Sequence, residues 1–132
     1  MKGIGSRVTK ALNVGSYVKC ADNTGAKLLQ IIAVRGYKGV RRRYPKAGIG
    51  DIVYCSVKKG EPKLRKQVVK AVIIRQKKEY RRADGMRIKF DDNAAVLITD
   101  KLEPRGSEIK GPVAKEVIER FPALGKVATI VV

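Results

Sequence analysis

The stretch QVVKAVIIRQKKEYRRADGMRIKFDDNAAVLIT, residues 67–99, decides the fold. It opens with a long segment rich in β-branched residues, residues 67–76, and closes with a second apolar run, and both compositions favour strands. Between these runs, residues 77–80 and 86–90 flank the tripeptide Ala83-Asp84-Gly85, and Asp-Gly is a strong hairpin signal. The stretch therefore predicts two core strands with a short hairpin between them.

Segments before this stretch show the same strand character. Residues 51–58 alternate, with Val53, Cys55 and Val57 on one apolar face. Asp22-Asn23-Thr24-Gly25 has the composition of a turn, because Asp and Asn bond nearby backbone and Gly adopts positive φ. Short strands at this spacing favour a mainly β fold, a small closed antiparallel β-barrel without exposed sheet edges. The predicted strands are residues 16–21, 27–34, 51–58, 67–76 and 94–99.

The pattern changes period near the C-terminus. After Gly111-Pro112, the apolar residues Val113, Val117 and Phe121 recur with helical spacing and form one stripe. A short helix over residues 112–121 is predicted, since Pro suits a first helical turn. Glu116 and Arg120 would form an i,i+4 pair on its polar side.

The length of 132 residues indicates one domain, residues 1–132. Residues 1–15 are interpreted as a basic N-terminal extension that becomes ordered on a partner. They lack the continuous apolar run of a signal peptide, and no segment of the sequence is apolar over the length that spans a bilayer.

Charge is distributed unevenly. The chain holds 30 Lys and Arg and 12 Asp and Glu, a formal net charge of +18. All of the excess lies in residues 1–90, in three basic runs at residues 35–46, 58–70 and 75–89, while residues 91–132 are close to neutral. Such an asymmetry predicts an anion-facing body and a tail with another role.

Residue content excludes several function classes. The sequence has no histidine, which excludes Ser-His-Asp and Cys-His catalysis and His metal ligands. Two cysteines, Cys20 and Cys55, are too few for a structural zinc site. They could form one disulfide, but we interpret them as small apolar fillers in a reducing cytoplasm. Asp91-Asp92 is interpreted as a polar strand end, not a catalytic pair. No enzyme activity, metal or cofactor is predicted.

Nucleic acid is the partner that three cationic runs in a small domain indicate. The sequence contains no helix-turn-helix, zinc finger or basic zipper. Basic residues placed in loops and hairpins suit irregularly shaped RNA better than the uniform groove of DNA. A membrane-surface role would require a basic amphipathic helix, and the one predicted helix is nearly neutral.

Four sequence blocks carry a family resemblance. The stretch from Lys70 to Ile98 resembles the signature of the universal large-subunit ribosomal protein fourteen family. The blocks 21–27, 48–58 and 111–116 match the same family in the same order. Tyr80-Arg81-Arg82 and the triple arginine at residues 41–43 are similar to its archaeal and eukaryotic branch.

The resemblance implies a fold and a set of partners. It implies a five-stranded closed β-barrel with a projecting β-ribbon and a small C-terminal helical region. It implies a structural role in the large subunit of the cytoplasmic ribosome, with binding to large-subunit rRNA and participation in intersubunit bridges to small-subunit rRNA. The implied protein neighbours are large-subunit proteins three and, of the eukaryotic type, twenty-four, and anti-association initiation factor six at the C-terminal side. The alternative is a non-ribosomal basic RNA-binding regulator.

Two sets of site residues follow. The predicted RNA-binding residues are Lys38, Arg41, Arg42, Arg43, Tyr44, Lys46, Lys58, Lys59, Lys63, Arg65, Lys66, Arg75, Lys77, Lys78, Arg81 and Arg82. The predicted protein-interface residues, on the outer side of the helix, are Lys115, Glu116, Glu119 and Arg120.

Overall fold

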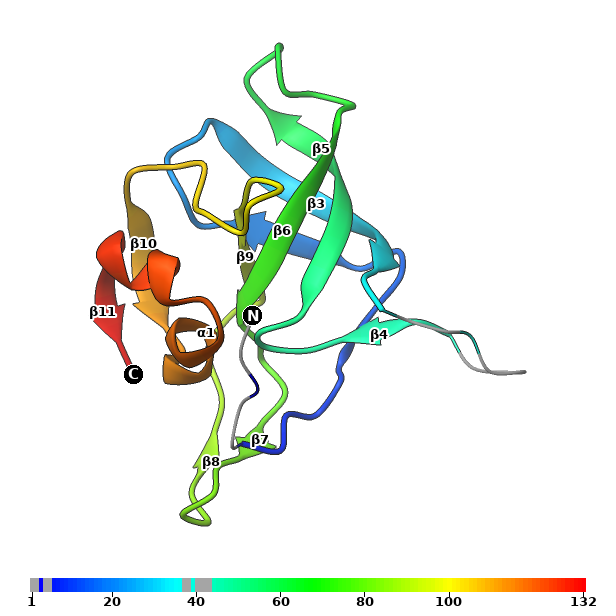
Figure 1. The fold of residues 1–132 in the computed structure, drawn as a ribbon. Coiled ribbons are helices and arrows are strands. Elements are labelled where there is room, and N and C mark those ends of the chain that lie inside the picture. Colours follow the sequence, from blue (N-terminus) through cyan, green and yellow to red (C-terminus); the bar gives the residue numbers. More distant parts are fainter. Residues whose placement is uncertain (1–2, 4–5, 37–38, 40–43) are drawn as a thin grey trace.

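The computed structural model describes residues 3, 6–36, 39 and 44–132, and this part of the chain is mainly β (Figure 1). Four of the predicted RNA-binding residues, Lys38 and Arg41 to Arg43, lie outside the described residues. The elements in chain order are β1 (Leu12–Asn13), β2 (Tyr17–Cys20), β3 (Ala26–Val34), β4 (Lys46–Ala47), β5 (Ile52–Gly60), β6 (Val68–Arg75), β7 (Tyr80–Arg81), β8 (Arg87–Ile88), β9 (Ala94–Leu97), β10 (Ile109–Val113), α1 (Lys115–Arg120), the 3-10 helix η1 (Pro122–Lys126) and β11 (Ala128–Val131).

Strands β2, β3, β5, β6 and β9 form a closed barrel, which confirms the predicted architecture. Four neighbouring pairs are antiparallel, and the closing pair β2–β9 is parallel. The reason is parity. Strand directions cannot alternate all the way around a ring with an odd number of strands, so one pair must run the same way.

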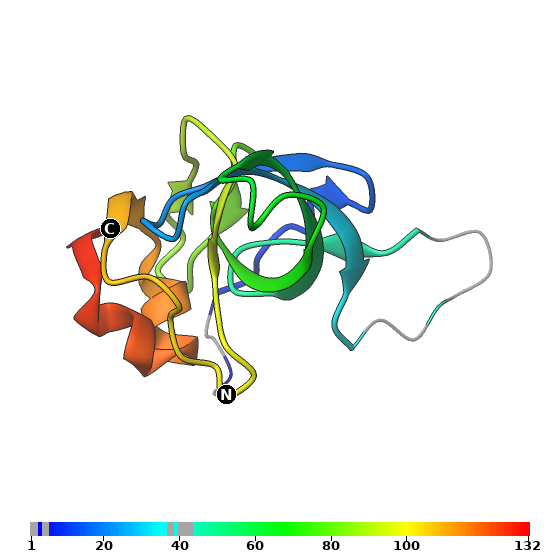
Figure 2. The same cartoon turned by 90° about the horizontal axis from the view of Figure 1, so that it is seen from above.

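The C-terminal unit consists of β10, α1, η1 and β11. It lies against one side of the barrel (Figures 1 and 2). The predicted burial of Val113, Val117 and Phe121 is confirmed, since all three belong to the common hydrophobic core, but only Val117 lies within α1. The helix itself is shorter than predicted. Residues up to Val113 form β10 because they pair in parallel with β11, a partner far along the chain.

The N-terminal segment folds back onto the barrel from Ser6 onward. Strand β1 pairs with β4, and Leu12 belongs to the core. The buried Gln76 amide donates from Nε2 to the Thr9 carbonyl at 3.1 Å and accepts the Ile49 N–H at Oε1. The described part of the predicted extension is therefore packed against the barrel in the folded chain. Within the described residues, no helix is long and apolar enough to span a membrane.

Candidate nucleic-acid interface

The β5–β6 turn, residues 58–67, carries the densest described group of exposed cations. Leu64 is buried beneath it, and Lys66 adopts a left-handed φ of 62° while its N–H donates to the Val57 carbonyl. These contacts hold the turn in one shape. All five predicted cations of this segment are exposed: Lys58, Lys59, Lys63, Arg65 and Lys66. Within the described part of the chain, only Lys63 of these five has an ion pair, with Glu61 at 3.5 Å.

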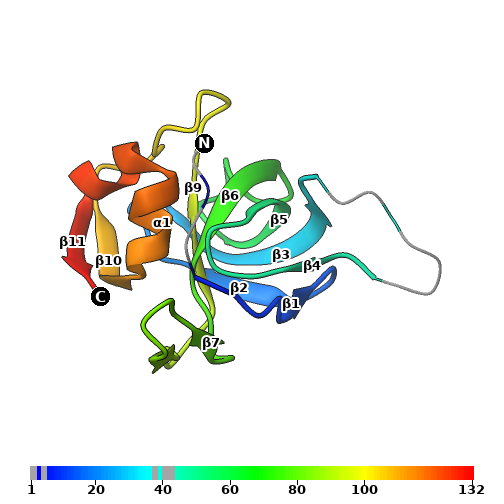
Figure 3. The same ribbon diagram turned by 60° about the horizontal axis from the view of Figure 1, so that its bottom comes forward.

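The second candidate segment lies at β4, on the opposite side of the barrel from the C-terminal unit (Figure 3). Tyr44 is 78% exposed, and Lys46 is also exposed. Asp51 accepts the Gly48 N–H at 2.8 Å, so the chain turns tightly between β4 and β5. An exposed aromatic ring beside cations has the chemistry for stacking on an RNA base.

The third segment is the β7–β8 ribbon, at the end of the barrel opposite the β5–β6 turn (Figure 1). The predicted hairpin is confirmed: Tyr80 pairs with Ile88 and Arg81 with Arg87 across the turn. The two ribbon strands are shorter than predicted because the backbone groups just before β7 form hydrogen bonds with side chains instead of with a partner strand. Asn93 accepts the Lys77 N–H, and Gln76 donates to the Lys78 carbonyl.

A buried carboxylate attaches this ribbon to the C-terminal unit. Glu116 is 0% exposed and accepts hydrogen bonds from Arg82 Nε at 2.7 Å and from the Tyr80 hydroxyl at 2.7 Å. Arg82 also donates to the Val132 carbonyl, and Ser6 donates to Glu116. We call Tyr80, Arg82 and Glu116 the ribbon clamp. The predicted outward position of Glu116 is wrong, and the clamp removes Arg82 from the surface proposed for RNA.

The pKa values of the ribbon clamp show that its groups stabilise each other's charge states. Burial acts to raise the pKa of Glu116, but the hydrogen bonds from Arg82 and Tyr80 outweigh it and hold that pKa below its ordinary value. Burial acts to lower the pKa of Arg82, and its bonds to Glu116 and Tyr80 reverse the effect. Burial, reinforced by the bond to Glu116, raises the pKa of the Tyr80 hydroxyl. At neutral pH the clamp is a carboxylate held by a guanidinium and a neutral phenol.

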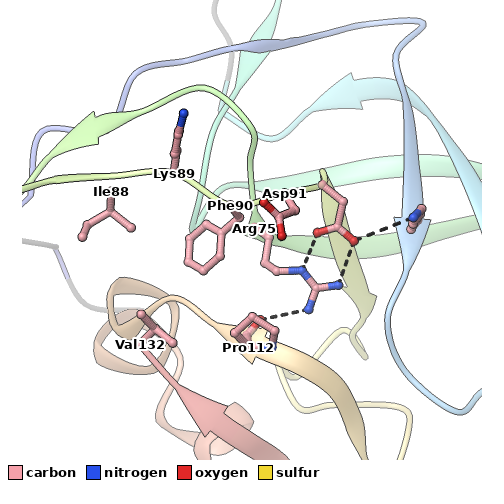
Figure 4. Close-up of a pocket in the computed structure, with 9 residues that line it drawn as sticks. Arg75, Ile88, Lys89, Phe90, Asp91, Pro112 and Val132 are labelled. Atoms are coloured by element: carbon pink, nitrogen blue, oxygen red, sulfur yellow. Dashed lines mark hydrogen bonds and ion pairs between the residues drawn. The ribbon is translucent and has the colours of Figure 1, made fainter.

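Arg75 is likewise a structural residue, contrary to its predicted place at the RNA interface. It is 7% exposed, and Nε and Nη2 donate to the two oxygens of Asp92 at 2.7 and 3.2 Å. Nη1 donates to the carbonyls of Lys110 and Pro112, both at 2.9 Å. Figure 4 shows this guanidinium at a pocket of about 500 Å³ between β8 and β10. Arg75 therefore connects the barrel to the C-terminal unit.

Only two of the four residues predicted for a protein interface lie exposed on the outer side of α1. Lys115 and Glu119 are exposed. Arg120 is half-buried and points to the barrel, where Nη1 lies 3.3 Å from the Gly50 carbonyl and 3.6 Å from Asp51. The predicted Glu116–Arg120 pair does not form, because each side chain has a partner on another element.

The remaining predicted cations, Lys77, Lys78 and Arg81, are exposed. Sequence reasoning missed Arg87 and Arg7, which the structure places next to Arg81. Arg87 could have been found by counting outward from the Asp84-Gly85 turn. Arg7 could not, because its partner strand lies far along the chain.

Cys20 and Cys55 are free thiols, in agreement with their interpretation as fillers. Burial raises the pKa of each to about 12, so both are protonated at neutral pH. In the part of the chain that the structure describes, no group of three or more acidic or Cys side chains could hold a metal.

Comparison with known proteins gives one consistent result. The family model for ribosomal protein L14p/L23e matches residues 11–132. The chain is 58% identical over 99% of both chains to a protein of Methanococcus vannielii named large ribosomal subunit protein uL14. It is 58% identical to the protein of that name from Methanoregula boonei over the full length of both, and 56% identical to that from Methanothrix thermoacetophila.

Proposed function

The chain belongs to the ribosomal protein L14p/L23e family. We propose that, as a structural protein of the large ribosomal subunit, it binds large-subunit rRNA through its exposed cations. The observation that carries the proposal is the β5–β6 turn, where five cations face solvent and one exposed carboxylate pairs with one of them. A turn held rigid by a buried Leu64 presents these charges without a further loss of backbone entropy.

The proposed mechanism is charge neutralisation on a fixed shape. Each phosphate that a Lys or Arg neutralises releases condensed counterions, so affinity must fall steeply with salt. Arg side chains add bidentate contacts to phosphate oxygens, and Tyr44 offers a ring for stacking. The proposed contact residues among those described are Tyr44, Lys46, Lys58, Lys59, Lys63, Arg65, Lys66, Lys77, Lys78 and Arg81. Lys38 and Arg41 to Arg43 remain proposed contacts on sequence grounds alone.

We assign protein contacts to the C-terminal unit. Residues 91–132, which include this unit, are close to neutral, and such a region suits a protein surface better than an RNA surface. For the protein as a whole, the proposed partners are large-subunit protein three, large-subunit protein twenty-four of the eukaryotic type and small-subunit rRNA at bridges. Anti-association initiation factor six is the partner proposed for the C-terminal side. Lys115 and Glu119 are the exposed residues of α1 that could contact such a factor. Charge reversal at both should weaken factor binding in a pull-down, and unchanged binding would remove α1 from that interface.

Salt-titrated co-sedimentation with large subunits tests the proposal. Tagged protein should co-sediment with large subunits in cells and should bind deproteinised large-subunit rRNA with an affinity that falls as KCl rises. A non-ribosomal RNA-binding regulator would leave the tagged protein in lighter fractions, and that distribution would refute a ribosomal role.

A further inference from the structure

Three arginines lie side by side across the base of the ribbon. Arg81 of β7 is the cross-strand partner of Arg87 on β8, and on its other side it forms an antiparallel bridge with Arg7. The Arg7 N–H donates to the Arg81 carbonyl at 3.0 Å, which fixes the register. We call Arg7, Arg81 and Arg87 the arginine row.

The three side chains share one face. Residues directly opposite each other in antiparallel strands project to the same side, with Cβ atoms about 5 Å apart. Arg7, Arg81 and Arg87 all line the same open groove of about 430 Å³, together with Val8 and Thr9. All three arginines are exposed. The groove is thus a hollow walled by guanidinium groups.

Like charges directly opposite each other destabilise a sheet pair unless something neutralises them. Among the described residues, the one ion pair recorded for the row is Arg87 with Glu79 at 3.3 Å, between two exposed side chains. A pair of that kind contributes little. The row therefore carries more positive charge than its own protein compensates.

We propose that the arginine row is a binding site for backbone phosphates of large-subunit rRNA, an assignment that rests on the proposed function. Guanidinium forks match phosphate oxygens bidentately, and three in one row can hold neighbouring phosphates of a folded strand. An acidic protein is the less suitable occupant, because among the described residues Val8 is the only apolar side chain that lines the groove, and protein interfaces have an apolar centre.

The opposite face of the ribbon holds the row in position. Successive residues of a strand point to opposite faces, so Arg81 faces the groove while Tyr80 and Arg82 face Glu116. The Arg7 segment is held in turn by the bond from Gln76 to the Thr9 carbonyl. The ribbon clamp is thus a positioning device, and the site exists before RNA binds.

Two measurements on the full-length chain test the site, both with deproteinised large-subunit rRNA of Methanococcus vannielii as the probe. The first is the slope of log affinity against log KCl for the triple variant R7Q/R81Q/R87Q. We expect the slope to decrease by about 2 to 3, because each lost phosphate contact removes roughly one. The matched control K101Q/R105Q/K126Q removes the same charge from exposed positions elsewhere and should change the slope by less than about 1. Equal decreases in both variants would overturn the site.

The second measurement needs no variant and therefore does not depend on its folding. Phenylglyoxal modification of the wild-type protein, read by mass spectrometry, should show Arg7, Arg81 and Arg87 protected in the rRNA complex while Arg105 stays reactive. If rRNA binds with a steep salt dependence but the three arginines still react with phenylglyoxal, the arginine row is not a phosphate-binding site, and the proposed function stands. If the row is protected only in assembled subunits, its ligand is a protein and the phosphate site is refuted. If wild-type protein does not bind rRNA at all, the proposed function fails with it.

Discussion

The β5–β6 turn and the β7–β8 ribbon come from equally basic stretches of sequence, yet their cations have different fates. In the turn, every predicted cation is exposed. In the ribbon and the strand that leads to it, Arg75 and Arg82 are held by Asp92 and Glu116, while Arg81 and Arg87 face solvent.

The difference teaches that charge density alone does not identify a binding surface. A carboxylate brought in from the C-terminal unit converts a cation into a structural residue, because a buried charge must be paired. Strand alternation then separates the two kinds within one ribbon, with Arg82 on the inner face and Arg81 on the outer. Four predictions test this division between structural and available cations.

The largest effect is expected at the ribbon clamp. Glu116→Gln should lower the free energy of unfolding by about 3 kcal/mol at pH 7, because it leaves the Arg82 guanidinium without its counter-charge. Chemical denaturation measures the loss. Glu119→Gln, an exposed change on the same helix, is the matched control and should stay within about 0.5 kcal/mol. Equal losses would show that Glu116 has no special role.

The same variant carries a pH signature. The folded-state pKa of Glu116 lies below its ordinary value of 4.5, so the stabilisation is present above that pH and is lost as pH falls below it. The difference between wild type and Glu116→Gln should therefore shrink on acidification below about pH 4. The folded-state pKa of Tyr80 is raised above its ordinary value of 10.0. The contribution of the Tyr80 hydroxyl to the free energy of unfolding is therefore present below pH 10 and is lost as the pH rises above that value. A pH-independent difference would contradict the proposed charge state.

Arg75→Gln should have the next largest effect. It removes hydrogen bonds to Asp92 and to two β10 carbonyls, and a loss of about 2 kcal/mol is expected, smaller than at Glu116 because Asp92 keeps contact with solvent. Lys77→Gln, two residues away and exposed, is the control. If Arg75 were instead an RNA contact, its substitution would lower rRNA affinity without changing the unfolding midpoint.

The smallest effect on stability is expected in the turn. The triple variant K59Q/R65Q/K66Q should change the free energy of unfolding by no more than about 0.5 kcal/mol, since these side chains are exposed and, among the described residues, only Lys63 of this turn has an ion pair. Its salt slope for rRNA should nevertheless decrease by about 2 to 3. A large loss of stability with an unchanged slope would reverse the assignment of turn and ribbon.

Local patterns predicted the elements that depend on neighbouring residues. The Asp84-Gly85 hairpin formed as expected, and Val113, Val117 and Phe121 are buried as predicted, although only Val117 lies within the helix. Strands β10 and β11 were missed because each satisfies its backbone through a distant partner, and Gly111-Pro112 indicated a helix start instead. Glu116 was placed on the wrong side for a related reason: helical spacing shows which positions are apolar, and a buried charge breaks that rule.

The amino-acid sequence alone determined that this chain forms a mainly β barrel with a cationic body and a neutral tail, because periodicity and net charge are local or additive properties. Only the tertiary structure decided which arginines are paired with carboxylates of the same chain and which remain exposed. That outcome depends on pairing between residues such as Arg82 and Glu116, and Arg7 and Arg81, which are far apart along the chain and meet only after folding.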